Sequence, residues 1–144
     1  MMHKHFYRFF CLLSIICFFG CTDGKILKVG ECDFKIEEAH TTEERALGLM
    51  YRESISDDFG MLFFLGRELN AQSEGGFHMQ NMNFPLDMVF ISADKRVADI
   101  QTVPPCQTPI CLLYCPAEPS YYVLEVNAGK SEKCNLQIGD MLDF

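Results

Sequence analysis

The sequence predicts an α+β domain that is mainly β, with a mostly antiparallel sheet rolled towards a small barrel and one or two short helices. Three observations predict this fold class. Several short segments alternate apolar and polar residues with the period of a strand, most connections are of hairpin length, and only two short stretches carry helix signals. We expect about seven or eight strands, with the helices closing one end.

Length and composition allow one domain and exclude several classes of protein. The chain has 144 residues, of which 49% are hydrophobic, so it can form a single core. The formal net charge is −8, and because the first 20 residues carry Lys4 and Arg8 but no acid, the remainder carries −10. A domain this acidic repels phosphate backbones, so we expect no nucleic-acid binding.

The N-terminus has the pattern of an export signal. Lys4 and Arg8 precede the apolar residues 9–19, a run too short to span a bilayer, and Gly20-Cys21 follows it. A small residue before a cysteine is typical of a bacterial lipobox, so we predict lipidation of Cys21; ordinary secretion is the alternative. The predicted division is a lipoprotein-type signal peptide (residues 1–20), a tether (21–25) and one globular domain (26–144). The protein would then be anchored in the cell membrane or outer membrane, facing the periplasm or exterior.

The first half of the domain contains one helix between strands. Residues 26–29 and 32–39 read as strands, and a helix follows to about Tyr51. Thr41 and Glu44 form a capping box, and Leu47, Met50 and Tyr51 share the expected core-facing stripe. Gly48 weakens such a helix unless another group packs closely against its backbone.

The middle of the chain reads as strands separated by turns. Residues 61–65 are a continuous apolar run that fits a strand buried on both faces, and residues 66–75 form a polar loop. A strand is expected from residue 77 to 82, a second from 86 to 92, and a third from 96 to 103 after a hairpin turn at 93–95.

The last third begins with a loop rich in proline. Residues 104–119 hold five of the six prolines and three cysteines, which favours an ordered loop over helix or central strand. Residues 121–126 read as a strand, residues 130–134 as a helical turn with Asn135 as a left-handed cap, and residues 136–142 as a last strand.

Several motifs in this order resemble a known family. They are Gly48-Leu49-Met50-Tyr51-Arg52, Gly60-Met61-Leu62-Phe63, Phe77-x-Met79-x-Asn81, Pro85-Leu86-Asp87-x-Val89-Phe90-Ile91, Cys106 with Cys111 and Tyr114, Tyr122-Val123-Leu124-Glu125, Ala128-Gly129 and Gly139-Asp140. Together they resemble the bacterial and archaeal domain of unknown function 192. The resemblance covers roughly residues 31–141 and implies a compact, β-rich, frequently exported domain with no established activity.

The resemblance also implies one disulfide, and this chain differs from the family pattern at three positions. The family pattern implies a Cys106–Cys111 bond, which would pin the proline-rich loop. Where the family usually has Trp, Lys and Thr, this chain has His78, Gln80 and Met82. In a strand these three share one face and Phe77, Met79 and Asn81 the other, so we expect the first face to bind and the second to pack.

Asp87 is the most conspicuous single residue, because a carboxylate opens an otherwise apolar strand. It shares a face with Val89 and Ile91, so we expect it to be at least half buried and to need a cation or several donors. Asn81 and Arg52 are the expected partners. A structural brace is favoured over a general acid or base, because no nucleophile motif, zinc-protease motif or phosphate-binding loop accompanies it.

Metal and redox chemistry are alternatives that the sequence leaves open. His78 with nearby methionines could bind Cu(I), although methionines at core positions usually fill gaps. With Cys21 lipidated, five cysteines remain in the domain, so one thiol is free or pairs between molecules. Cys106, Cys111 and Cys115 could instead hold zinc with His78 or Cys134, or a pair could be redox-active.

The function expected from the sequence is therefore that of a binding or accessory module at the cell envelope, with no cofactor. The candidate binding residues are Arg52, His78, Gln80, Asn81 and Asp87. They are expected to line a groove between residues 77–87, Arg52 and the proline-rich loop. A copper or zinc protein and an enzyme using Asp87 with Arg52 are the alternatives.

Overall fold

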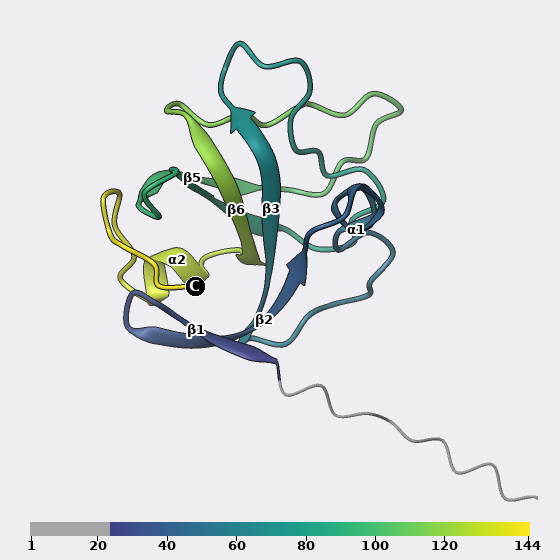
Figure 1. Ribbon diagram of the computed structural model, residues 1–144. Helices are drawn as coiled ribbons and strands as arrows, with labels where there is room; N and C mark the ends of the chain where they lie inside the picture. The colour runs from purple at the N-terminus through teal and green to yellow at the C-terminus, as the bar shows by residue number, and fades with distance from the viewer. Residues whose placement is uncertain (1–23) are drawn as a thin grey trace, which may run out of the picture.

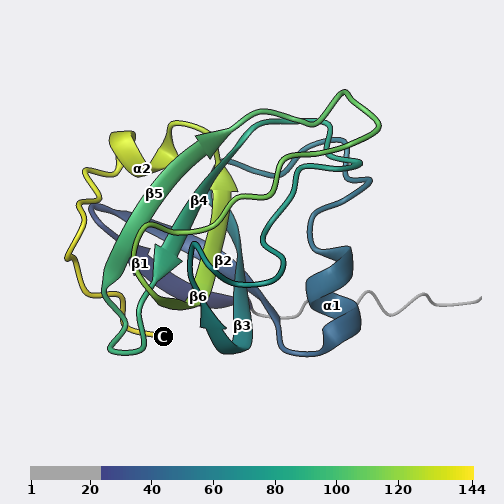
Figure 2. The ribbon, with the colours of Figure 1, turned by 90° about the horizontal axis from the view of Figure 1, so that it is seen from above.

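The computed structural model describes residues 24–144, so the predicted signal peptide and Cys21 lie outside the described part of the chain. The elements are β1 (Lys25–Val29), β2 (Cys32–Ala39), α1 (Thr42–Leu47), β3 (Phe59–Leu69), β4 (Leu86–Ile91), β5 (Val97–Val103), β6 (Ser120–Asn127) and α2 (Lys130–Lys133). They form one domain with the two short helices at opposite sides of it (Figures 1 and 2). None of these helices is long and apolar enough to cross a membrane.

The strands form one six-stranded sheet in the order β1-β2-β3-β6-β4-β5. All neighbouring pairs are antiparallel except β2 and β3, which run parallel because the chain crosses between them through α1. The mainly β fold class with two short helices is confirmed. The sheet does not close into a barrel, because β1 and β5 end the described sheet without pairing with each other.

Two predicted strands are absent from the described residues. Phe77 makes one isolated bridge with Tyr114, and the chain then turns at Gln80 and Asn81, where Asn81 has a φ of 58°. Residues 136–142 likewise make one bridge, between Arg96 and Met141. Both strands were predicted from an alternation of apolar and polar residues. That prediction was wrong because successive side chains can point to opposite sides in a turn as well as in a strand.

Helix α1 begins as predicted and ends early. Thr41 and Glu44 form the predicted capping box. Gly48 takes a φ of 48°, and the ring of Phe63 packs against it, with Cζ lying 3.3 Å from where a Cβ would be. The helix therefore ends at Leu47 and not at Tyr51. The predicted stripe is wrong as well, since Leu47 and Tyr51 are exposed and Leu49 is buried.

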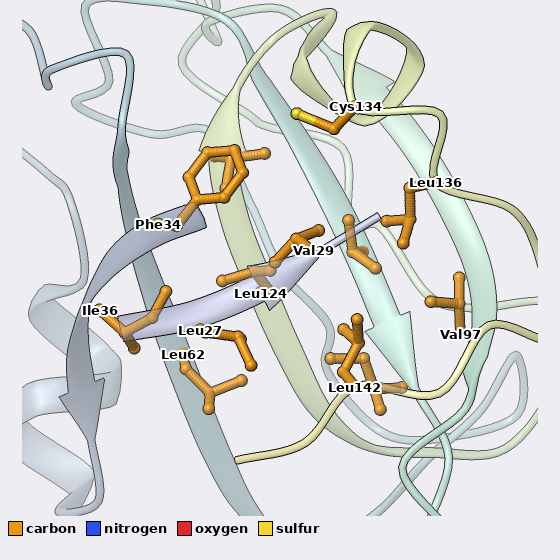
Figure 3. Close-up of a cluster of buried hydrophobic side chains, with 13 residues drawn as sticks. Leu27, Val29, Phe34, Ile36, Leu62, Val97, Leu124, Cys134, Leu136 and Leu142 are labelled. Carbon is orange, nitrogen blue, oxygen red and sulfur yellow. The ribbon is translucent and has the colours of Figure 1, made fainter. Parts of the chain in front are cut away.

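The two faces of the sheet carry two separate hydrophobic clusters. The first, which we call the closed face, contains Leu62, Val89, Ile91, Leu124 and Val126, and residues from β1, β2 and the C-terminal segment cover it (Figure 3). The second, which we call the methionine face, contains the neighbours of those residues along the same strands, with four buried methionines: Met61, Met79, Met82 and Met88.

Two disulfides fasten the fold. Cys106–Cys111 is confirmed and lies in the predicted proline-rich loop. Cys32–Cys134 joins the start of β2 to the end of α2, which brings residues 102 apart in sequence together over the closed face. Cys115 is the free thiol of the described residues.

Candidate functional site

A cavity of about 380 Å³ opens on the methionine face. Its walls come from α1 and the turn after it, from β3, and from residues 76–82. Eleven of its 18 lining residues are apolar, while polar and apolar atoms contribute about equally to the surface inside it. The lining residues are Thr42, Arg45, Ala46, Leu47, Gly48, Leu49, Met50, Phe63, Leu65, Arg67, Leu69, Gly76, Phe77, His78, Met79, Met82, Leu86 and Glu125. Ligand sites in proteins typically occupy roughly 300–1,000 Å³, so this cavity suits a small molecule.

Strand β3 builds one wall by simple alternation. Phe63, Leu65, Arg67 and Leu69 are two residues apart and all line the cavity. Strand β3 continues four residues beyond the predicted apolar run, through part of the predicted loop 66–75, and its register against β6 shifts between Phe64 and Leu69. The extension places a cation, Arg67, at the edge of the cavity.

The opposite wall, residues 76–82, is held by backbone hydrogen bonds to the proline-rich loop. Phe77 and Tyr114 exchange both N–H···O bonds, at 3.0 and 2.7 Å, and the Cys106 N–H donates to the Met79 carbonyl at 3.0 Å. The Cys106–Cys111 disulfide therefore supports this wall from behind. Met79 is 1% exposed, so the wall is also packed into the core.

Glu125 is the buried polar group of the cavity. It lies in β6, one of the two central strands, directly between Met61 of β3 and Met88 of β4. The residue is 5% exposed, and no side chain or backbone group among the described residues hydrogen-bonds to its carboxyl group. Burial raises the pKa of Glu125 to about 8, so the group is mainly protonated at neutral pH.

Two arginines line the cavity where it meets solvent. Arg45 donates to the His40 carbonyl and, at 3.1 Å, to the Phe64 carbonyl. Arg67 donates to the Glu74 carbonyl at 3.3 Å. Within residues 24–144 neither arginine forms an ion pair with a carboxylate. With Glu125 protonated, the charges lining the cavity are positive although the whole protein is acidic.

Comparison with known proteins assigns the domain to a family. The family model DUF192, described as "Uncharacterized ACR", matches residues 25–144, nearly the whole described chain. The chain belongs to the DUF192 family. The resemblance expected from the motifs is thereby confirmed.

Relatives of this DUF192 domain span archaea and bacteria. A UPF0127 protein of Pyrococcus furiosus is 27% identical over 125 residues, covering 85% of this chain and 93% of the relative. A UPF0127 protein of Pyrococcus abyssi is 27% identical over 112 residues, covering 76% of this chain and 86% of that relative.

Two crystal structures have the same fold. A protein from Sinorhizobium meliloti, designated a candidate transcription regulator, superposes with a TM-score of 0.67 and 32% identity over 82% of this chain and 89% of the other. A protein of unknown function from Novosphingobium aromaticivorans gives a TM-score of 0.62 and 31% identity over 83% of this chain and 82% of the other. The description of the family assigns it no activity.

The structure does not gather the five predicted binding residues into one site. Of the five, His78 lines the cavity of the DUF192 domain. Gln80 is exposed in the turn beside it. Asn81 is exposed and donates to the Tyr51 hydroxyl at 2.9 Å, while the Tyr51 N–H donates to the Asn81 carbonyl at 3.0 Å. These two bonds tie the cavity wall to the turn after α1. That His78, Gln80 or Asn81 binds a ligand stays a prediction.

The predicted partnership of Asp87 with Arg52 and Asn81 is wrong. Asp87 is 1% exposed, as expected, but it accepts from the Thr102 hydroxyl at 2.7 Å and the Ser131 N–H at 2.9 Å. Arg52 instead pairs with Glu37 at 2.8 Å. Because Asp87 is buried and satisfied on the closed face, it acts as a brace between β4, β5 and α2. The alternative of an enzyme that uses Asp87 together with Arg52 is therefore not supported by their positions.

The described part of the structure also contradicts the predicted zinc site, because disulfides occupy most of its cysteines. Cys106, Cys111 and Cys134 are all in disulfides, so Cys115 is left alone. No three His, Cys, Asp or Glu side chains gather as a metal site within residues 24–144. His78, Met79 and Met82 all line the cavity, so a Cu(I) site that uses them stays a prediction.

Sequence reasoning missed Glu125, although a signal was present. Glu125 interrupts the apolar run 122–126 just as Asp87 interrupts the run 86–91. Only Asp87 was singled out. The sequence could not say that one carboxyl group would meet two donors and the other a cavity, because the partners of both come from distant segments.

Proposed function

We propose that this DUF192 domain is a binding module that holds a small, mainly apolar molecule in the cavity on its methionine face, and that it does so at the cell envelope. The observation that carries the proposal is the carboxyl group of Glu125, which has no hydrogen-bond partner among the described residues and whose oxygens remain accessible in the cavity. Burial of this residue disfavours its charged form, so the cavity presents an unpaired polar group. A ligand that hydrogen-bonds to Glu125 would supply the missing partner.

The composition of the cavity supports a ligand over a simple packing defect. Small-molecule sites combine mostly apolar walls with a few polar groups that orient the ligand. Leucine, methionine and phenylalanine side chains form the walls, and Arg45, Arg67, His78 and Glu125 are the charged or titratable groups in the lining. Methionine suits such a wall, because its flexible side chain adapts to different shapes.

The disulfides and the N-terminal pattern support a location outside the cytosol. Disulfides persist in oxidising compartments, and this small domain contains two of them. Strand β1 begins at Lys25, close behind Cys21. A lipid on Cys21 would therefore hold the domain against a membrane, and stable anchoring needs two or more acyl chains.

A tryptophan reporter tests ligand binding. The chain contains no tryptophan. Ala46 is an exposed residue of α1 that lines the cavity, and Ala71 is an exposed loop residue that is not part of the lining. We expect octan-1-ol to change the fluorescence of Ala46→Trp with a saturable curve and to leave Ala71→Trp without one. Identical, non-saturating responses in both variants would contradict a binding cavity.

Metabolic labelling tests the anchor. We expect radioactive palmitate to label the protein and to place it in the membrane fraction, and Cys21→Ser to remove both properties. Label that persists in Cys21→Ser, or a wild-type protein without label, would contradict lipidation at this cysteine.

A further inference from the structure

We propose that the ligand is a small amphipathic anion, such as a medium-chain carboxylate, whose charged group binds Arg45 and Arg67 while its apolar body lies between α1 and β3. This inference rests on the proposed binding function and specifies its ligand class. Three features of the cavity support it: the state of the two arginines, the distribution of charge, and the position of Glu125.

Both arginines keep donors available for an anion. A guanidinium group has five N–H donors in a planar fork that matches a carboxylate. Arg67 uses one of them, toward the Glu74 carbonyl, and the residue is exposed at the mouth. Arg45 uses three of its five donors, on the carbonyls of His40 and Phe64 and on the Thr42 hydroxyl, which leaves one Nη2–H and the Nε–H. These bonds fix its position without neutralising its charge.

Two acids that neighbour the arginines in sequence, Glu44 and Glu68, hydrogen-bond to other groups. The Glu44 carboxylate accepts from the backbone N–H groups of His40 and Thr41, each at 2.8 Å, and thus serves the start of α1. Glu68 interacts with Asn70 and Tyr121. An anion entering between Arg45 and Arg67 would therefore meet two cations that no carboxylate of the described residues pairs with.

Glu125 sets the orientation of the ligand. A charged group is costly to bury without a partner, so the anionic end of the ligand belongs at the exposed Arg67 and the partly buried Arg45, and the apolar body belongs inside. The interior then presents one carboxyl group, which burial keeps protonated, as a donor to a neutral oxygen. A ligand with a hydroxyl or carbonyl group at its far end would satisfy Glu125. A cationic ligand is disfavoured, because Arg45 and Arg67 would repel it at the mouth.

Four probes of equal chain length test the class on the purified protein. We expect octanoate to bind more tightly than octan-1-ol, octylamine to bind most weakly, and 8-hydroxyoctanoate to bind more tightly than octanoate. Calorimetry at low salt measures each dissociation constant. Octan-1-ol or octylamine binding more tightly than octanoate would overturn the inference while sustaining the proposed function; failure of all four probes to bind would overturn both.

Two substitutions assign the roles of the residues. Arg67→Gln should weaken octanoate about five-fold, the size expected for an exposed ion pair, and leave octan-1-ol unchanged. Arg67→Lys should restore part of the loss, and Arg96→Gln, a surface arginine outside the cavity lining, is the matched control. Glu125→Leu should remove the advantage of 8-hydroxyoctanoate over octanoate. If Arg67→Gln and Arg96→Gln affect octanoate equally, the arginine site is wrong.

Discussion

The two faces of the sheet are packed from different side chains and are covered to different degrees. On the closed face, leucine, isoleucine, valine and phenylalanine form most of the cluster (Figure 3). The Cys32–Cys134 disulfide fastens the C-terminal segment over it. The methionine face contains four buried methionines, of which Met79 and Met82 line the cavity beside α1. Branched side chains with few rotamers favour one tight packing, whereas methionine tolerates an adaptable site. The difference separates a closed, tightly packed face from the face on which we propose that a ligand binds.

Each face also contains one buried carboxyl group, and the two groups are treated differently. Asp87 receives a hydroxyl and a backbone N–H from β5 and α2, so its charge is compensated. Glu125 lies between two methionines without a partner, so burial keeps it protonated. The first group stabilises the fold, whereas the second costs stability that a ligand could recover. Four predictions test this contrast.

Removal of the disulfide of the closed face should have the largest effect. Cys32 and Cys134 are 102 residues apart, and the chain-entropy model gives about 4–5 kcal/mol for a loop of that length. Cys106 and Cys111 are 5 residues apart, for which the same model gives about 2 kcal/mol. Chemical denaturation of Cys32→Ser/Cys134→Ser and Cys106→Ser/Cys111→Ser measures both. Equal losses in the free energy of unfolding for the two double variants would contradict a larger stabilising role for Cys32–Cys134.

Replacement of Glu125 should stabilise the protein with a defined pH dependence. The unfolded chain loses the Glu125 proton near the ordinary pKa of 4.5, and the folded protein near 8, so the wild type loses stability as the pH rises between these values. Relative to wild type, Glu125→Gln should gain about 3 kcal/mol in the free energy of unfolding between pH 4.5 and pH 7.

Urea denaturation across that pH range measures the gain, with the exposed Glu118→Gln as control. Parallel pH profiles for Glu125→Gln and wild type would contradict a protonated Glu125.

Replacement of Asp87 should have the opposite sign. In Asp87→Asn the amide oxygen can still accept from the Ser131 N–H and the NH₂ group can donate to the Thr102 hydroxyl, but two hydrogen bonds to a carboxylate become weaker bonds between neutral groups. We expect a loss of about 2 kcal/mol at pH 7, from thermal or chemical denaturation. Asp33→Asn, at an exposed position of β2, should change the free energy of unfolding by less than about 0.5 kcal/mol. If Asp87→Asn left the stability unchanged or raised it, the proposed contrast between Asp87 and Glu125 would be contradicted.

Exchange of leucine and methionine should have the smallest effect and should differ between faces. Met82→Leu in the cavity wall should cost less than about 1 kcal/mol, because the cavity absorbs the change in shape. Leu62→Met, on the closed face, should lower the free energy of unfolding by more than Met82→Leu does, up to about 1.5 kcal/mol. The reverse order would contradict the idea that the methionine face is the adaptable one.

Much of the local structure could be predicted from the sequence. The strand β2, the capping box at Thr41 and Glu44, the left-handed Asn135 and the Cys106–Cys111 disulfide lie where they were expected. Each depends on neighbours within a few residues or on a motif with fixed spacing. The candidate site could be predicted only in part, since His78 lines the cavity but Glu125 and the two arginines were not foreseen.

The sequence by itself determined where the six strands of the sheet lie, where α1 begins, and that a carboxylate would be buried in β4, because these properties follow from the periodicity and chemistry of adjacent residues. The tertiary structure alone decided that Asp87 meets Thr102 and Ser131, that Arg52 turns to Glu37, and that Glu125 faces a cavity. Those outcomes depend on which distant strands become neighbours and in which register. Local patterns do not record that choice, because it is made by the packing of the whole sheet.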